Sequence, residues 1–215
     1  MLVVFDLDGT LLNTIQDLTA AVNVALSANG WPTRSEEECL HFVGNGVTKL
    51  LERALPQGEQ TPEAVNALRS SFFSYYNEHL TDFTLPYPGI VDLLQTLQMH
   101  GIKQAVASNK YHAATQKIIT HFFPQISFTA VLGQREGIST KPHPAVVREI
   151  LSLAGETKEN CLYVGDSDVD IQTARNADVR VCAVTWGFRC AKMLSSFHPD
   201  YLIERPADLL SILQL

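Results

Sequence analysis

The sequence predicts an α/β protein in which a doubly wound parallel sheet is interrupted, after its first strand, by a small helical domain. The chain begins with a short run of apolar, mostly β-branched residues, which is typical of a buried strand. Residues 13–80 show helical patterns and no strand pattern, whereas strand-like and helix-like segments alternate from residue 87 onward. Such alternation is typical of parallel strands joined by right-handed crossovers. We therefore expect an α/β core formed by residues 1–12 and 84–215, and a helical domain formed by residues 13–83.

The composition is that of an ordinary globular protein, with 46% hydrophobic and 18% charged residues among 215. The net charge of −7 argues against a surface for nucleic acid or for anionic membranes, although a metal and a few local cations can still attract an anionic substrate. The four cysteines show neither a CxxC pair nor zinc-ligand spacing, so we expect mostly buried thiols in a reducing compartment. Met1 directly precedes the first strand and no apolar run reaches transmembrane length, which predicts a cytoplasmic protein without a signal peptide.

Helix signals follow one another through the predicted helical domain. Residues 14–17 have the form of a capping box, and apolar residues recur at helical spacing after it. A second helix is expected to start at Ser35, because the three glutamates that follow suit the positive end of a helix dipole. A third is expected over residues 47–55, and Thr61 with the following proline predicts a fourth that runs towards Leu80.

In the predicted core, glycine-containing and polar segments separate strands from helices. The helices are expected at residues 90–99, 113–122, 144–153 and 171–176. The later strands are expected at residues 103–107, 128–132, 162–164 and 179–184, with a short sixth at 201–203.

Two carboxylates directly follow the first strand. Asp6 and Asp8 are two residues apart, so their side chains should point the same way at the C-terminal edge of the strand. Acids this close repel each other unless a divalent cation or a shared proton lies between them. Gly9 supplies a tight turn and Thr10 a hydroxyl beside it. Because ligands of open α/β sheets bind beyond the strand C-termini, we prefer a cation and ligand site here to a solvated acidic turn.

Polar residues also follow the second and third strands. Ser108 and Asn109 would offer a hydroxyl and backbone N–H groups to an anion near a helix start, although a serine in this position, taken alone, is more often a helix cap. Lys141 is followed by two prolines that flank His143 and stiffen the backbone. A lone lysine is usually a solvated charge, but a rigid cation suits a site for a phosphate dianion.

Three further acids follow the fourth strand. Asp166 lies at the tip of the strand, and Asp170, four residues later, could lie on the same face of the next helix turn. Asp168 should point elsewhere and cap that helix.

Together these segments resemble the sequence motifs of the haloacid dehalogenase (HAD) superfamily of phosphohydrolases. The match comprises DLDGT at residues 6–10, the serine after the second strand, the lysine after the third and a GDxxxD pair after the fourth, and it spans residues 3–170. The resemblance implies a Rossmann-like parallel sheet, the HAD fold. Dehalogenases of the superfamily lack the second aspartate, so the presence of Asp8 favours phosphoryl chemistry.

The same resemblance implies a mechanism through an aspartyl-phosphate. Asp6 would attack phosphorus, and Asp8 would protonate the leaving alkoxide and then activate water. Magnesium (Mg²⁺) would be bound by Asp6, the backbone carbonyl of Asp8, and Asp166. Asp170 would steady either the water shell of the metal or Lys141. The residues implied to hold the transferred phosphate are Thr10, Ser108, Asn109 and Lys141.

The helical insert resembles the cap domain of one HAD subgroup, with hinges near residues 12–13 and 83–86. Within it, a loop runs into a helix that carries two cations, so that backbone N–H groups and positive charge are offered to an anion. The alternative is a tight turn between helices with two surface cations. The residues of this candidate substrate site are Gly44, Asn45, Gly46, Lys49 and Arg53.

Residues 43–55, 108–110 and 141–144 closely resemble the phosphoglycolate phosphatase group of the superfamily. This implies a small phosphorylated metabolite that also carries a carboxylate, and no nucleic-acid or membrane partner; monomer and homodimer both stay open. Pyrophosphatase, sugar-phosphate phosphatase and β-phosphoglucomutase activities remain alternatives, because caps are easily repurposed. A receiver-like phospho-acceptor domain is an alternative of another class, but receivers carry their aspartate on a later strand and lack such an insert.

Overall fold

The computed structural model describes residues 1–215, which form two compact units. One unit, here called the core, comprises Met1–Asn13 and Pro86–Leu215. The other, the helical unit, comprises Thr14–Leu85. Each is described by itself.

The core contains a six-stranded sheet in which every neighbouring pair of strands is parallel. Strand β1 lies in its interior, with Val4 opposite Ala105 on one side and Tyr163 on the other. In spatial order the strands are β5 (Ala130–Gln134), β4 (Lys103–Tyr111), β1 (Leu2–Phe5), β6 (Cys161–Gly165), β7 (Arg180–Val184) and β8 (Tyr201–Ile203).

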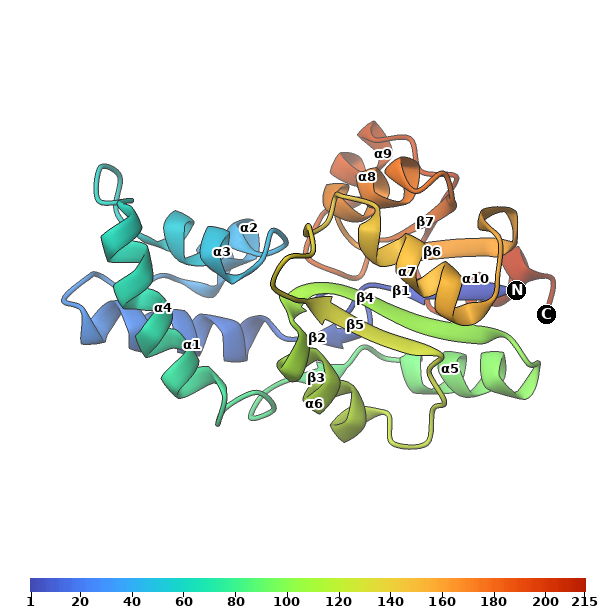
Figure 1. Ribbon diagram of the computed structural model, residues 1–215, viewed down its shortest axis with the longest axis horizontal. Helices are drawn as coiled ribbons and strands as arrows, with labels where there is room; N and C mark the ends of the chain where they lie inside the picture. Colours follow the sequence, from blue (N-terminus) through green and yellow to red (C-terminus); the bar gives the residue numbers. More distant parts are fainter. The chain divides into compact units, whose positions relative to one another are not determined.

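Helices cover both faces of this sheet, with α5 and α6 on one side and α7 to α9 on the other (Figure 1). Because both faces are covered, β1 is apolar throughout rather than alternating, as the sequence predicted. The core helices are α5 (Ile90–Met99), α6 (His112–Phe122), α7 (Ala145–Ala154), α8 (Asp168–Asn176), α9 (Ala191–Ser196) and α10 (Asp208–Leu213), with a 3₁₀ turn at Lys158–Asn160.

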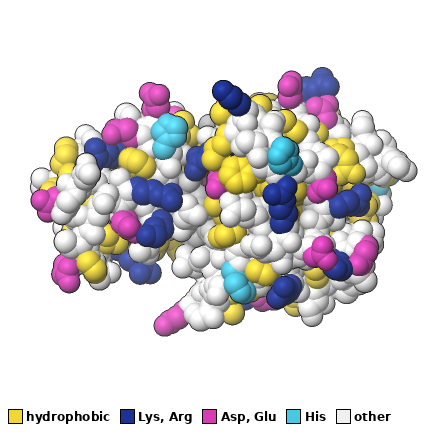
Figure 2. Space-filling view, turned by 90° about the horizontal axis from the view of Figure 1, so that it is seen from above, with side chains coloured by type: hydrophobic (Ala, Val, Ile, Leu, Met, Phe, Trp, Pro, Cys, Tyr) yellow, Lys and Arg dark blue, Asp and Glu magenta, His cyan; other side chains and the backbone are white.

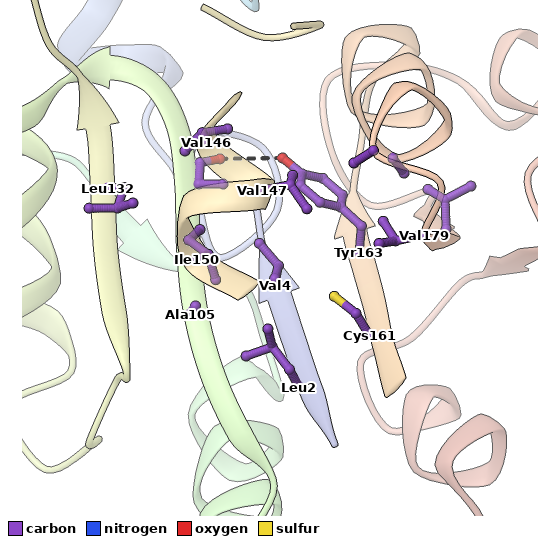
Figure 3. Close-up of a cluster of buried hydrophobic side chains, with 14 of the residues drawn as sticks. Leu2, Val4, Ala105, Leu132, Val146, Val147, Ile150, Cys161, Tyr163 and Val179 are labelled. Carbon is purple, nitrogen blue, oxygen red and sulfur yellow. Dashed lines mark hydrogen bonds between the residues drawn. The ribbon is translucent and has the colours of Figure 1, made fainter. Parts of the chain in front are cut away.

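One hydrophobic cluster lies between the sheet and α7 and α8 (Figure 3). Leu2 and Val4 of β1 point into it beside Val147 and Ile150 of α7, and all four are fully buried. Tyr163 of β6 belongs to the same cluster, but its hydroxyl reaches the C-terminal end of the sheet. The cluster therefore fixes the strand ends from which the polar residues project.

The strand order places a topological switch point at β1. From β1 the chain reaches β4 and then β5 on one side, and returns to β6, β7 and β8 on the other. Crossovers that diverge in this way open a crevice beyond the carboxyl end of the central strand. The crevice lies where Asp6 follows Phe5.

The helical unit consists of α1 (Ile15–Ala28), α2 (Glu36–Phe42), α3 (Val47–Ala54) and α4 (Pro62–Tyr76). Helix α2 begins with a complete capping box, because the Ser35 hydroxyl accepts the Glu38 N–H and the Glu38 carboxylate accepts the Ser35 N–H. Helix α4 begins after Thr61, as expected, but ends at Tyr76 rather than near Leu80.

The capping box predicted at residues 14–17 is wrong, because the Thr14 side chain makes no capping hydrogen bond. Its acidic member instead binds backbone distant in sequence. The buried Asp17 carboxylate accepts the Phe83 N–H at 3.0 Å, the Thr84 N–H at 2.9 Å and the Thr84 hydroxyl at 2.6 Å. Asp17 thereby ties the start of α1 to the segment that closes the unit.

Replacing Asp17 by Asn should therefore destabilise the protein by about 2–3 kcal/mol, since an amide N–H₂ group would face donors that a carboxylate oxygen now accepts. Urea unfolding measures this loss. The matched control Glu63→Gln, on the exposed first turn of α4, should cost under about 0.5 kcal/mol. Equal stability of the two variants would contradict the role given to Asp17.

Several other boundaries differ from those predicted. Strand β4 continues to Tyr111 instead of ending at residue 107, and β5 begins at Ala130, two residues later than expected. The sequence patterns also missed α9, α10 and a two-stranded sheet formed by β2 (Leu12–Asn13) and β3 (Leu85–Pro86). These elements span only two to six residues, which is too short for periodicity to reveal.

Basic and acidic side chains are interspersed on the face shown in Figure 2. None of the helices is both long and apolar enough to cross a membrane. Three of the four cysteines are buried, as expected, while Cys190 is exposed.

Candidate active site

The loop after β1 is a tight turn that presents Asp6. Its Oδ1 accepts the Leu7 N–H at 2.7 Å, and the Leu7 carbonyl in turn accepts the N–H groups of Thr10, Leu11 and Leu12. Gly9 adopts a φ of +85°, which few other residues adopt without strain. Asp6 is only 8% exposed. The turn thus holds a nearly buried carboxylate at the crevice.

Lys141 lies between two carboxylates. Its Nζ is 2.8 Å from Asp6 Oδ1 and 2.8 Å from Asp170 Oδ1, and it also donates to the Ala107 carbonyl and to the Tyr163 hydroxyl, each at 3.0 Å. The Asn109 side chain holds the backbone of this lysine, donating to its carbonyl at 3.0 Å and accepting its N–H at 2.8 Å. Lys141 is thus fixed at both the main chain and the ammonium group.

Asp166, after β6, is held by two donors from different loops. Its Oδ1 accepts the Thr10 hydroxyl at 3.2 Å, and its Oδ2 accepts the Phe188 N–H at 2.7 Å. The Trp186 indole N–H donates to the Thr10 carbonyl at 3.0 Å, so the segment after β7 braces both the turn and the carboxylate.

Asp170 is fully buried at the start of α8. Its Oδ2 accepts the Ser167 N–H and hydroxyl in a capping box, while its Oδ1 accepts from Lys141 and Tyr163. The prediction that Asp168 caps this helix is wrong: the N-cap is Ser167, and Asp168 is the first helical residue. An Asx or Ser preference at the cap cannot by itself choose between adjacent candidates.

Asp6, Asp166 and Asp170 converge, with one carboxylate oxygen of each lying within 4.8 Å of the others. Burial, reinforced by the Asp170 carboxylate, raises the pKa of Asp6 and raises the pKa of Asp166 to about 7. Burial alone would lower the pKa of Lys141, but the Asp170 and Asp6 carboxylates outweigh it and raise that pKa. A crowded set of hard oxygen donors with one internal ammonium fits a divalent cation such as Mg²⁺, which would relieve the remaining repulsion.

Asp8 is paired with a lysine that was not singled out as a site residue from the sequence. Lys110 Nζ lies 3.0 Å from Asp8 Oδ1 and 3.1 Å from Oδ2, and the lysine side chain is only 3% exposed. Its backbone N–H donates to Ser108 Oγ at 3.1 Å. Ser108, Asn109 and Lys110 lie near the end of β4 rather than after the strand as predicted, while α6 begins close to them at His112, as expected.

Within the helical unit, most of the candidate residues lie in or against the loop at residues 44–46. Arg53 donates to the Phe42 carbonyl and to Asn45 Oδ1, each at 2.8 Å, while Gly44 and Gly46 both have positive φ. Lys49, by contrast, is exposed and pairs with Glu52 at 2.6 Å. Arg53 thus shapes the loop at residues 44–46, which leads into α3.

Sequence reasoning placed eight residues at this end of the sheet, and the structure brings them together: Asp6, Asp8, Thr10, Ser108, Asn109, Lys141, Asp166 and Asp170. It missed the roles of Lys110 and Tyr163, because these depend on contacts between distant strands. A polar hydroxyl within an otherwise apolar strand was the available signal for Tyr163.

Gly187 is the point at which the brace after β7 touches the site. A Cβ at this position would collide with the Gly9 carbonyl and with the Asp166 side chain. Gly187→Ala should therefore displace Asp166, lower turnover by roughly a hundred-fold or more and raise the Mg²⁺ concentration for half-maximal activity. Gly155→Ala, where nothing lies within 4 Å of the added Cβ, should lose some stability because its φ is +60°, but should leave both quantities unchanged. Unaltered magnesium dependence in Gly187→Ala would contradict this packing role.

Comparisons with known proteins agree with the family that the sequence motifs resemble. Residues 3–184 match the model of the family described as haloacid dehalogenase-like hydrolase. A phosphoglycolate phosphatase from Mannheimia succiniciproducens is 35% identical, and the match covers 98% of this chain and 97% of the relative. Another, from Cereibacter sphaeroides, is 38% identical, and the match covers 88% of this chain and 87% of the relative. A crystal structure of a candidate phosphoglycolate phosphatase from Lactobacillus delbrueckii subsp. bulgaricus superimposes with a TM-score of 0.91 at 34% identity, covering 96% of this chain and 95% of the other.

Proposed function

The chain belongs to the haloacid dehalogenase-like hydrolases, and from this premise we propose that it is a Mg²⁺-dependent phosphatase that converts 2-phosphoglycolate and water into glycolate and phosphate. The observation that carries the proposal is the convergence of Asp6, Asp8 and Lys141 with Asp166 and Asp170 at the carboxyl end of β1. The choice of substrate is supported by the relatives. Two phosphoglycolate phosphatases match this chain, one over nearly its full length and the other over most of it.

In the proposed reaction Asp6 is the nucleophile. Both donors to Asp6 contact Oδ1, so Oδ2 is the oxygen we assign to the attack on phosphorus. The bond from phosphorus to the glycolate oxygen breaks as the aspartyl-phosphate forms, and Asp8 gives its proton to that oxygen. In the second step Asp8 takes a proton from a water molecule whose oxygen attacks phosphorus. The bond between phosphorus and Asp6 breaks, so that phosphate leaves and the Asp6 carboxylate is regenerated.

The other core residues bind and orient. We assign Thr10, Ser108, the Asn109 backbone and Lys141 to the transferred phosphate, with the Asn109 side chain fixing the lysine. Asp6, the Asp8 carbonyl and Asp166 would hold Mg²⁺, which would supply charge stabilisation for the phosphoryl oxygens. Asp170 positions Lys141 rather than contacting substrate.

We also propose that the helical unit acts as the cap that selects the substrate. The loop at residues 44–46 presents backbone N–H groups at the start of α3, and the contacts of Arg53 with Phe42 and Asn45 support a role for this arginine in fixing the loop. Lys49, on the first turn of α3, is exposed and pairs with Glu52.

Phosphate release across a panel tests the proposal. The panel contains 2-phosphoglycolate, 2-hydroxyethyl phosphate, pyrophosphate, glucose 1-phosphate and several sugar phosphates, each with Mg²⁺ and with EDTA. The proposal expects the highest kcat/KM for 2-phosphoglycolate and no turnover in EDTA. A preference for pyrophosphate or for a sugar phosphate would keep the core chemistry and refute the substrate.

Proton competition should govern metal binding, because Asp166 has a pKa raised to about 7 by burial and by Asp170. Below this pKa the folded protein holds a proton that Mg²⁺ must displace, and above it the site is already ionised. The apparent affinity should fall by about thirty-fold between pH 8 and pH 5.5, with proton uptake by the buffer on binding at the lower pH. Calorimetric titration in two buffers measures both quantities, and a pH-independent affinity would contradict the assignment of Asp166 as a ligand.

A further inference from the structure

We propose that Lys110 binds the carboxylate of the substrate and is the residue of the core that makes the enzyme selective for phosphorylated hydroxy acids. This rests on the proposed function and deepens it, because the roles assigned there cover the phosphate and the metal and include none for this buried cation.

Lys110 is placed at the reacting end of the sheet by β4. Its ammonium spans both oxygens of Asp8 at 3.0 and 3.1 Å, and only 3% of its side chain is exposed, whereas 14% of the Asp8 side chain is. The Asp8 carboxylate offsets the cost of burying this ammonium, which touches both of its oxygens. A second anion that approaches Asp8 must therefore approach Lys110 as well.

The structure of the substrate requires that a cation for its carboxylate lie close to Asp8. In 2-phosphoglycolate a single carbon separates the leaving oxygen from the carboxyl carbon. The group that protonates the leaving oxygen is Asp8 in the proposed reaction, so the carboxylate must lie within about one side-chain length of that residue. Lys110, which touches Asp8 directly, meets this condition.

Four other candidate cations have different partners, and one of them, Lys49, is exposed and pairs with Glu52. Lys141 is held by Asp6, Asp170, the Tyr163 hydroxyl and the Ala107 carbonyl, and it faces the nucleophile. Arg53 uses its guanidinium on the Phe42 carbonyl and on Asn45. Arg189 acts on Asp166, whose pKa it lowers in opposition to burial. Lys110 is the cation whose position suits the acid group of a two-carbon substrate.

A comparison of two substrates separates recognition of the carboxylate from positioning of Asp8. 2-Phosphoglycolate and 2-hydroxyethyl phosphate both carry the leaving oxygen on a two-carbon chain, but the second has a hydroxymethyl group in place of the carboxylate. Lys110→Met should lower kcat/KM for 2-phosphoglycolate about 10- to 100-fold more than for 2-hydroxyethyl phosphate. Lys110→Arg, which keeps a cation, should retain most of the preference, and it serves as the second variant if Lys110→Met does not fold. The exposed Lys192→Met is the matched control and should leave both values unchanged.

The outcomes distinguish the two proposals. If Lys110→Met loses kcat/KM equally on both substrates, Lys110 only positions Asp8 and the inference is overturned. It is also overturned if Arg53→Met abolishes the preference for 2-phosphoglycolate while Lys110→Met retains it. Loss of the preference in Lys110→Arg would also count against recognition by charge. If the wild-type enzyme itself shows no preference for 2-phosphoglycolate, the proposed function fails before the role of Lys110 is reached.

Discussion

Asp6→Asn is expected to lower turnover of 2-phosphoglycolate by roughly a thousand-fold or more while leaving the fold intact. An amide cannot attack phosphorus, so the aspartyl-phosphate cannot form. The amide oxygen can still accept the Leu7 N–H and the Lys141 ammonium. Because burial and Asp170 already disfavour the ionised form and raise the pKa of Asp6, the metal-free variant should be at least as stable as the wild type. Steady-state phosphate release and urea unfolding in EDTA measure the two effects.

The exposed Asp92→Asn, on the first turn of α5, is the control and should change neither quantity. Residual activity within ten-fold of wild type in Asp6→Asn would assign the nucleophile elsewhere.

Lys141→Met should be damaging to both stability and activity. Removing the ammonium leaves the Asp6 and Asp170 carboxylates, each 2.8 Å from it, facing each other in a buried site. Breaking a buried pair by removing one partner costs about 3–5 kcal/mol, and we expect a loss of that size in EDTA, with part of it recovered on adding Mg²⁺. Turnover should fall by roughly a hundred-fold or more, since the transferred phosphate also loses a fixed cation.

Lys192→Met keeps the same chemical change on the exposed surface of α9 and should cost under about 0.5 kcal/mol. If Lys141→Met unfolded at the same urea concentration as this control in EDTA, the central ion-pair network would not have the energetic weight assigned to it.

The fold was predictable where a pattern is local and repeated. The apolar run of β1 and the alternating segments after residue 87 led to the parallel sheet, and the acids that end β1 and β6 led to the site at its edge. The same reasoning failed where a local pattern competes with a tertiary contact. Residues 14–17 fit a capping box, yet the carboxylate of Asp17 binds Phe83 and Thr84, which no local rule can foresee.

The candidate site shows the same division. Asp6 and Asp8 could be identified from their spacing, and Lys141 from the prolines that follow it and stiffen the backbone. Lys110, however, looks like one more polar residue after a strand, because a strand boundary placed at residue 107 hides that β4 continues and brings its side chain to Asp8. Tyr163 and Phe188 likewise act only once β6 and the segment after β7 lie beside β1.

The most direct test of the account is to trap the covalent intermediate. The enzyme is mixed with excess 2-phosphoglycolate and Mg²⁺, quenched in acid and reduced with borohydride, which converts an aspartyl-phosphate into homoserine. Peptide mass spectrometry should then find the reduced residue at position 6, only when substrate and metal are both present, and not in Asp6→Asn. A reduced residue at any other aspartate, or none while turnover proceeds, would contradict the assignment of Asp6 and with it the proposed mechanism.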